Sequence, residues 1–373
     1  MGVALACVGA PAPSWAGPDC EGADRPAQAP LAGPEDRPSR APLADCAERG
    51  DEVPGPAVTL HVGGAGTATF EGRSNNAYWG GALAGSFALV PGRAPEERRD
   101  VAYDARLGED GRMDVYFPDG DAPRNPAVLF IHGGGWTGGD KDHFRNAARR
   151  LARSGYVVAS TNYRLVPRGT FPRNIQDCLC SLAYLRAHAS EHRIDPDRIV
   201  VMGYSAGAHL AGLVGLASSN PEVAPDCAEA RGAPIAPPAG VIAACGPLDM
   251  RTFWRDAKDK ADIERIFGGS PATLPHAYAL GSPRWHVRAG APPFLVLGDA
   301  FDFGGIEETR DALAAAGNDV KLLKIAGSLH VLEQHADPGA YEVGMATETP
   351  EAWIAIDDFL DRTIGSARAG AAR

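Results

Sequence analysis

The amino-acid sequence predicts an α/β protein in which a mostly parallel central sheet is covered by helices on both faces. Three observations predict this class. Apolar runs of strand length alternate with amphipathic helical stretches over most of the chain. One apolar run leads directly into residues 203–207, a Gly-x-Ser-x-Gly turn that precedes a helix. An earlier run ends in the glycine-rich sequence His132–Trp136.

The individual strands and helices can be placed in chain order. Runs of apolar and β-branched residues predict strands at Arg99–Tyr103, Arg112–Tyr116, Ala127–Ile131, Val157–Thr161, Arg198–Met202, Gly240–Ala244, Phe294–Leu297 and Val320–Ile325. Apolar residues at helical spacing predict helices at Asp142–Ser154, Pro172–His192, Ala206–Ala217, Glu307–Ala316 and Pro350–Thr363. Two further β-like pieces, Val58–Val62 and Ser86–Val90, flank a glycine-rich stretch nearer the N-terminus.

The composition argues against several classes of function. The 373 residues are 45% hydrophobic, which is enough for a buried core. No uninterrupted apolar run reaches the ~18 residues that a membrane span needs. The net charge of −11 argues against a nucleic-acid partner, which would need a clustered basic surface. We therefore expect neither a membrane span nor nucleic-acid binding.

Ser205 is the candidate nucleophile. A serine in this turn lies on a sharp, strained connection between strand and helix, which exposes its hydroxyl at the sheet edge. The glycine-rich loop after the earlier strand is of the type that aims backbone N–H groups at an oxyanion. We expect the oxyanion hole to consist of the backbone N–H groups of Ala206, Gly134 and Gly135.

Three other residues of these motifs have less specific roles. His132 is expected to be a hydrogen-bonding residue of the loop rather than a second base. Trp136 and Tyr204 are candidates for lining the acyl pocket of the substrate site. Ordinary packing in the core is the alternative for both aromatic residues.

Together these motifs resemble those of α/β-hydrolase carboxylesterases with an HGGGW oxyanion loop, including the feruloyl/acetyl-esterase-like and hormone-sensitive-lipase-like groups. The resemblance covers roughly residues 98 to 362 and is specific to the fold and to the hydrolytic class rather than to the substrate. It includes Asn162–Pro167 after a strand, Phe171 and Pro172 before a long helix, and Ile194–Arg198 before the serine motif. It implies a serine esterase that uses no metal and no cofactor and that forms an acyl-enzyme.

The general base must follow the last strand, because the triad of this fold runs serine, acid, histidine along the chain. His330 comes just beyond the predicted strand Val320–Ile325 and is the expected base. His335, five residues later, is its competitor.

The triad acid is expected just after the strand Phe294–Leu297. The family usually has His-Gly-x-x-Asp there, whereas this chain has Leu297 in place of that histidine and one residue more before Asp302. We favour Asp302, which is better placed to fold back towards a base on the next loop. Asp299 is the first alternative. Asp249, after the preceding strand, is a third candidate, and its other reading is a turn or helix-capping aspartate.

Three expected segments precede a catalytic domain at residues 98–365. Residues 1–16 are expected to be a signal peptide, because Val3–Ala16 is apolar and ends in a small residue. An alanine-rich tail is the alternative. Residues 17–56 are expected to be a disordered Pro- and Ala-rich linker, and residues 57–97 a small β-rich extension. A signal peptide implies export to the periplasm or beyond, with a cytoplasmic location as the alternative.

The chain has seven cysteines. If Cys7 leaves with a signal peptide, six remain, an even number compatible with disulfides. The expected pairs are Cys20–Cys46 and Cys227–Cys245. Cys178 and Cys180 lie two apart in a predicted helix and face different sides, so we expect both to be buried as small apolar residues.

The sequence thus predicts a hydrolase of carboxylic esters, whose substrates are small molecules or are linked to polysaccharide. The insertion Ser218–Pro238 after the serine helix forms either a pocket wall or a surface excursion. It is too short for a full helical cap, so we expect an open, shallow site suited to short acyl groups. Two alternatives remain, namely an aryl-amide or formamide hydrolase with the same triad and a non-catalytic, hydrolase-like binding protein. The oligomeric state stays open.

Overall fold

The computed structural model describes residues 95–298, 304–325 and 350–365, together with short strands outside these ranges. The chain divides into two units, Met1–Asn75 and Asn76–Arg373. In the first unit, β1 (Val53–Pro54) pairs antiparallel with β4 (Arg73–Ser74), and β2 (Val58–Val62) pairs antiparallel with β3 (Gly66–Phe70). The strand predicted at residues 58–62 is therefore present. The expected strand Ser86–Val90, the expected signal peptide and the expected linker before Val53 lie outside the described residues, whereas β1 falls within the last residues of that expected linker.

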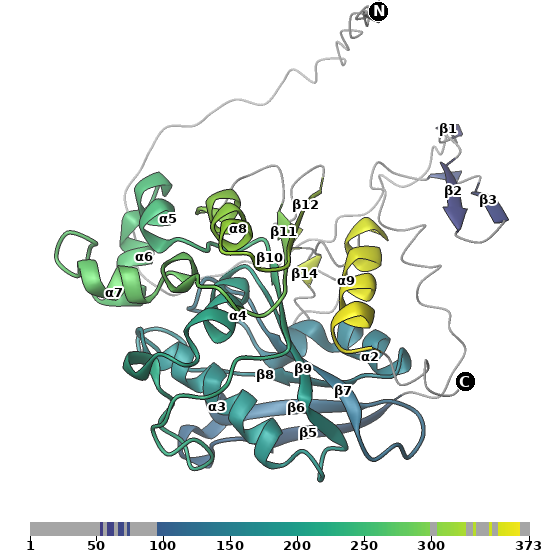
Figure 1. Ribbon diagram of the computed structural model, residues 1–373, viewed down its shortest axis with the longest axis horizontal. Coiled ribbons are helices and arrows are strands. Elements are labelled where there is room, and N and C mark those ends of the chain that lie inside the picture. Colours follow the sequence, from purple (N-terminus) through teal and green to yellow (C-terminus); the bar gives the residue numbers. More distant parts are fainter. Residues whose placement is uncertain are drawn as a thin grey trace, which may run out of the picture. The chain divides into compact units, whose positions relative to one another are not determined.

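The second unit is built on an eight-stranded sheet with the order β12-β11-β10-β9-β7-β8-β6-β5 (Figure 1). Its strands are β5 (Glu96–Ala102), β6 (Arg112–Phe117), β7 (Asn125–Ile131), β8 (Val157–Thr161), β9 (Ile194–Tyr204), β10 (Gly240–Ala244), β11 (Phe294–Gly298) and β12 (Val320–Lys324). Strand β6 runs antiparallel to both of its neighbours, and all other neighbouring pairs are parallel. This is the predicted mostly parallel sheet, and each of the eight strands predicted between Arg99 and Ile325 belongs to it.

The two faces of the sheet pack against different helices. Along β7, Ala127, Leu129 and Ile131 belong to one core cluster, whereas Val128 and Phe130 belong to the other, because successive side chains of a strand point to opposite faces. The first cluster contains buried residues of α3 (Arg173–Ala187), α4 (Ala206–Ala217) and α8 (Ile306–Ala315). The second contains residues of α2 (Arg145–Arg153) and α9 (Pro350–Thr363). Figure 1 shows these two layers on either side of the sheet.

The connection between β10 and β11 contains helices that the sequence pattern did not predict. These are α5 (Met250–Asp256), α6 (Lys260–Phe267), α7 (Pro275–Leu280) and the short 3₁₀ helix η4 (Pro283–His286). The ring of Phe267 stacks on Tyr278 at 4.1 Å and lies 5.3 Å from Phe171, which attaches this segment to the start of α3. Among the described helices, none combines the length and the apolar character that a membrane crossing requires.

Strand β5 forms one edge of the sheet and is strongly charged. It has the sequence EERRDVA, and most of its residues are exposed. Arg149 of α2 pairs with Glu97 at 2.6 Å, and Arg99 pairs with the fully buried Asp114 of β6 at 3.0 Å. Lys141, buried beside these groups, also contacts Asp114 at 3.4 Å. The charged edge is thus linked to the body of the protein by ion pairs.

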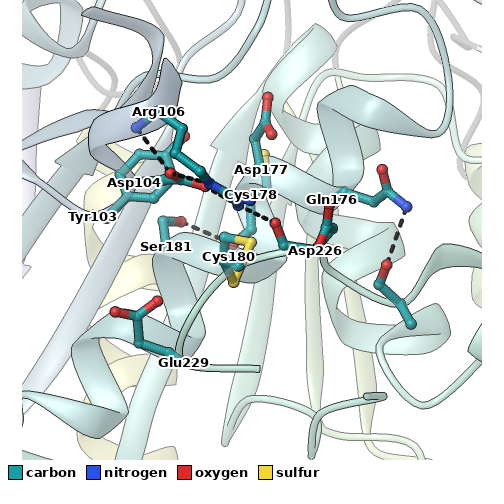
Figure 2. Close-up of a disulfide and its surroundings, with 12 residues drawn as sticks. Tyr103, Asp104, Arg106, Gln176, Asp177, Cys178, Cys180, Ser181, Asp226 and Glu229 are labelled. Carbon is teal, nitrogen blue, oxygen red and sulfur yellow. Dashed lines mark hydrogen bonds and ion pairs between the residues drawn. A yellow bond between two sulfur atoms is a disulfide. The ribbon is translucent and has the colours of Figure 1, made fainter. Parts of the chain in front are cut away.

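A disulfide joins Cys180 of α3 to Cys227 in the insertion that follows α4, with the two Cα atoms 5.9 Å apart (Figure 2). The expected pair Cys227–Cys245 is therefore wrong, and so is the expectation that Cys180 serves only as a small apolar residue. Cys178 is a buried thiol, as expected. Helical geometry explains the difference, because residues two apart face different directions and only Cys180 faces the insertion. The expected pair Cys20–Cys46 lies outside the described residues, as does Cys7.

The insertion Ser218–Pro238 runs along α3. Besides the disulfide, the Gln176 side chain donates a hydrogen bond to the carbonyl of Ala224 at 3.0 Å. Arg186, at the other end of α3, donates to the carbonyls of Ala236 and Pro237 at 2.6 and 2.8 Å. The carbonyl of Asp226 accepts a hydrogen bond from Arg106, whose ion pair with Asp104 is visible in Figure 2. These contacts make the insertion a surface excursion that covers the outer side of α3.

Candidate active site

Ser205 connects the end of β9 directly to the start of α4. Its backbone has φ 52° and ψ −119°, a conformation that residues other than glycine rarely adopt. The N–H of Ser205 donates to the carbonyl of Ala244, the last residue of β10, at 2.8 Å. Ser205 is partly exposed, whereas its neighbours Tyr204 and Ala206 are buried. The serine is therefore presented to solvent from a rigid, strained turn at the edge of the sheet.

Glycines surround this turn because backbone segments approach it too closely for a Cβ atom. A Cβ at Gly203 would overlap the carbonyl of Gly207, and one at Gly207 would overlap the carbonyl of Ile131, at the end of β7. A Cβ at Gly246 would overlap the carbonyl of Ser205 itself. The Gly-x-Ser-x-Gly pattern is thus a packing requirement of this junction, in addition to a requirement of its turn.

The glycine-rich loop passes beside Ser205. A Cβ placed on Gly133 would lie 3.2 Å from the Cβ of Ser205. The loop then turns sharply, because the N–H groups of Thr137 and Gly138 both donate to the carbonyl of Gly134, at 3.1 and 3.0 Å. Three consecutive residues have positive φ, namely Gly134 (106°), Gly135 (59°) and Trp136 (60°). The loop that follows β7 is therefore tightly folded and lies beside the serine.

The N-terminus of α4 also lies at Ser205. The N–H groups of Ala208 and His209 donate to the carbonyl of Ser205 at 3.0 and 3.2 Å, so the helix begins at the serine. The first N–H groups of a helix have no intrahelical acceptor and lie at the positive end of its dipole. Ala206, the first helical residue, is thus positioned to stabilise negative charge that develops beside Ser205.

His132 has a structural place in the loop. It is 1% exposed and its ring stacks on Tyr163 at 4.4 Å. Its Nδ1 lies 2.7 Å from the carbonyl of Gly133 and must carry the proton in that contact, because a carbonyl can only accept. The Tyr163 hydroxyl donates to the carbonyl of His132 at 3.0 Å. Burial lowers the pKa of His132 to about 4, so the ring is neutral at physiological pH.

Trp136 and Tyr204 are both buried, and they pack in the two different core clusters on opposite faces of the sheet. The indole N–H of Trp136 donates to Nδ1 of His209 at 3.2 Å, and its ring lies 6.2 Å from that of Phe253. The described contacts of Trp136 are thus packing contacts within the protein. His209, one turn along α4 from Ser205, was not singled out by the sequence patterns, because both of its partners are remote in sequence.

Asp249 caps a helix. Its side chain accepts from the N–H groups of Arg251 and Thr252 at the start of α5, at 3.0 and 3.3 Å, and from Arg284 at 3.2 Å. These three bonds account for both carboxylate oxygens. Asp249 therefore has the geometry of a helix-capping residue.

The other triad candidates fall outside the described residues. Asp299 and Asp302 follow β11, and His330 and His335 follow β12. Strands β9, β10, β11 and β12 are mutually parallel, so the chain leaves β11 and β12 at the carboxyl ends of the strands, where Ser205 also lies. The topology therefore starts each of these loops on the same side of the sheet as the serine.

The parallel sheet with its strained serine turn defines an α/β-hydrolase. The chain belongs to the BD-FAE family, whose model matches residues 113–302. Curated relatives include the probable carboxylic ester hydrolase LipM of Mycobacterium tuberculosis, 36% identical over 59% of this chain and 53% of LipM, and the esterase LipQ of the same organism, 29% identical over 56% of this chain and 50% of LipQ. The chain thus spans about half the length of the curated relatives it matches.

Solved structures show the same fold. A truncated carbohydrate esterase from gut microbiota is similar with a TM-score of 0.60 and 21% identity, covering 72% of this chain and 96% of that one. The thermophilic esterase Est2 of Thermogutta terrifontis is similar with a TM-score of 0.56 and 23% identity, covering 74% of this chain and 94% of that one.

Proposed function

We propose that this protein is a serine hydrolase that cleaves carboxylic esters. The observation that carries the proposal is the strained turn at Ser205, which lies beside the Gly133–Gly135 loop and at the N-terminus of α4. This arrangement offers a nucleophile and a set of backbone N–H donors at one point. The similarity to a probable carboxylic ester hydrolase and to an esterase supports the same chemistry.

In the proposed mechanism, the hydroxyl oxygen of Ser205 attacks the ester carbonyl while His330 takes its proton. The N–H groups of Gly134, Gly135 and Ala206 stabilise the oxyanion of the tetrahedral intermediate. The intermediate collapses to an acyl-enzyme as His330 returns the proton to the leaving alcohol. A water molecule, deprotonated by His330, then releases the acid by the reverse sequence.

Asp302 is proposed to hold the His330 ring in the correct tautomer, with Asp299 as the alternative. The two can be separated by exchanging each carboxylate for an amide. The amide at the true acid should lower kcat by about 10⁴, as loss of this orienting group does in other triads. Asp249→Asn is the matched control, because its carboxylate already caps α5, and it should lower stability more than kcat. A loss of kcat in Asp249→Asn as large as in either loop variant would overturn this assignment.

Short acyl groups are the proposed substrates. The insertion after α4 runs along α3 and is too short for a full helical cap, which supports an open, shallow site. Purified protein should be assayed against p-nitrophenyl acetate, butyrate and octanoate, with Ser205→Ala alongside. We expect hydrolysis of the two short esters that disappears in the variant. Faster turnover of octanoate would contradict the short-chain preference. Absence of Ser205-dependent turnover of all three esters would contradict the esterase proposal and favour an aryl-amide hydrolase or a binding protein.

We further propose that the protein is exported. The Cys180–Cys227 disulfide supports this, because such bonds persist in oxidising compartments and are rare in the cytosol of most organisms. N-terminal sequencing of the mature protein from its own host tests the proposal. Removal of the apolar segment Val3–Ala16 is the expected result, and an intact Met1 on a protein with reduced cysteines would contradict it.

A further inference from the structure

His209 is a fully buried histidine on α4, one turn after Ser205. Its Nε2 lies 2.7 Å from the carbonyl of Gly281, and its Nδ1 lies 3.2 Å from the indole nitrogen of Trp136. A carbonyl can only accept and an indole N–H can only donate, so the proton of His209 resides on Nε2 and Nδ1 is the acceptor. Both ring nitrogens are therefore satisfied by one neutral tautomer. Burial lowers the pKa of His209 to about 4, which is consistent with that neutral state.

The partner of His209, Trp136, is the last of the three loop residues with positive φ. A residue other than glycine keeps such a conformation only where its surroundings fix it. The surroundings of Trp136 are the hydrogen bond and edge contact to His209, with ring centroids 5.4 Å apart, the ring of Phe253, and the N–H of Val166, which donates to the Trp136 carbonyl at 2.9 Å. Of these, only His209 belongs to the helix that begins at the nucleophile.

One helix turn therefore connects both halves of the proposed oxyanion hole. Ala206 supplies one donor from the first residue of α4, and Gly134 and Gly135 supply the others from the loop that ends in Trp136. Oxyanion donors act only when they lie about 2.7–3.1 Å from the charge that develops in the transition state. A fixed link between helix and loop sets the spacing of these donors before the substrate arrives.

We infer that His209 is a positioning residue for the oxyanion hole, which holds Trp136 and through it the Gly134–Gly135 backbone against the nucleophile helix. This inference rests on the proposed esterase function. The role requires an acceptor directed at the indole and a donor directed at Gly281. Glutamine carries both kinds of group on a side chain of similar reach, whereas leucine fills the space without either.

The test compares His209→Leu, His209→Gln, Trp136→Phe and the double variant His209→Leu with Trp136→Phe, using p-nitrophenyl butyrate. Misplaced donors weaken the transition state more than the bound ester, so His209→Leu should lower kcat by about 10- to 100-fold with KM changed by less than about threefold. Trp136→Phe should have a similar effect. His209→Gln should recover several-fold in kcat over His209→Leu. The double variant should be no worse than the poorer single variant, because both changes break the same link.

His192→Leu is the matched control. His192 is also buried, at 1% exposure, but it lies at the opposite end of β9 from Ser205, near Phe117 and Tyr184. Neither ring nitrogen of His192 has a hydrogen-bond partner among the described residues, so its substitution breaks no such bond and should leave kcat unchanged. The melting temperature of every variant is measured first, and kcat is compared well below the lowest of them. If His209→Leu does not fold, Trp136→Phe and His209→Gln carry the same comparison.

The outcomes separate the two proposals. An active wild-type enzyme whose kcat is unchanged by His209→Leu and by Trp136→Phe would overturn the positioning role alone. Additive losses in the double variant would also overturn it, because the two residues would then act separately. Absence of Ser205-dependent turnover in the wild-type protein would overturn the esterase proposal and this inference together.

Discussion

Ser205 combines a reactive hydroxyl with a backbone conformation that most side chains avoid. Strain of this kind costs roughly 1–3 kcal/mol, whereas a glycine loses only about 0.5–1 kcal/mol more backbone entropy than alanine on folding. We therefore predict that Ser205→Gly is more stable than Ser205→Ala by about 1 kcal/mol, although both are inactive. Urea unfolding of the two variants measures the difference. A less stable glycine variant would show that the turn is not strained.

Two adjacent glycines of the oxyanion loop make a matched pair. Gly134 has φ 106°, and a Cβ there would overlap the carbonyl of Gly138, whereas Gly135 has φ 59° and its Cβ would meet nothing closer than 3.9 Å. We predict that Gly134→Ala lowers kcat by about 10²–10³, the cost of losing one oxyanion donor. Gly135→Ala should cost only about 1–2 kcal/mol of stability, with a loss of kcat below about tenfold. Steady-state kinetics of both variants decide this, and equal losses would contradict it.

At the scale of single residues, the sequence predicted what local patterns can encode. Ser205 and the loop glycines were identified because a sharp turn and a close backbone approach require particular residue types within a few positions. His209 was missed because its function depends on Trp136 and Gly281, more than 70 residues away on either side. The acid and the base lie in loops outside the described residues, and their assignment stays a prediction.

At the scale of elements, hydrophobic pattern predicted the sheet well. Strands β8 and β10 have the predicted bounds, and so do α4 and α9. Strand β9 starts four residues earlier than predicted, where Asp195, Pro196 and Asp197 interrupt the apolar pattern. Helices α5, α6 and α7 were missed because each has only six to eight residues, which is too short for a helical period to emerge. Disulfide partners are set by the fold and could not be deduced from spacing.

The disulfide gives a prediction about the insertion that it holds. Cys180 and Cys227 are 47 residues apart, and the chain-entropy model assigns about 4 kcal/mol to closing such a loop. We predict that Cys180→Ala combined with Cys227→Ala lowers the free energy of unfolding by about 2–4 kcal/mol. The proposed esterase activity at 25 °C should be retained, because the insertion packs along α3. Cys178→Ala, which removes a buried thiol of the same helix, is the control.

Unfolding curves with and without reductant measure this effect. Reductant should lower the stability of the wild-type protein and of Cys178→Ala, but not that of the double variant. A peptide map without reduction should contain the linked pair. Recovery of Cys180 and Cys227 as separate thiols from the oxidised protein would exclude the bond.

For the whole molecule, the buried histidines predict how stability depends on pH. Burial lowers the pKa of both His132 and His209 to about 4, against about 6.5 in an unfolded chain. Above pH 6.5 the two histidines are neutral in both the folded and the unfolded protein, so their protonation does not lower the free energy of unfolding. As the pH falls from 6.5 to 4, only the unfolded chain gains these protons, so each histidine removes about 1.4 kcal/mol per pH unit, and the loss levels off below pH 4.

Other groups also titrate in this range, so the test compares the pH dependence of the free energy of unfolding between the wild-type protein and a histidine variant. His209→Gln removes one of the two protons, and its stability should fall less steeply than that of the wild-type protein between pH 6.5 and 4. The free energy of unfolding at several pH values gives both slopes. Parallel curves would mean that His209 does not stay neutral in the folded state.

The charged edge strand β5 has a consequence for how molecules of this protein meet one another. An open sheet edge is a template on which another strand can add, which leads to aggregation or to sheet-extended dimers. Five consecutive charged residues, Glu96 to Asp100, occupy this edge, and a strand added to it would have to remove water from their side chains. The cost of desolvating these charges disfavours strand addition at β5, and any self-association of the hydrolase unit is expected to use a surface other than this edge.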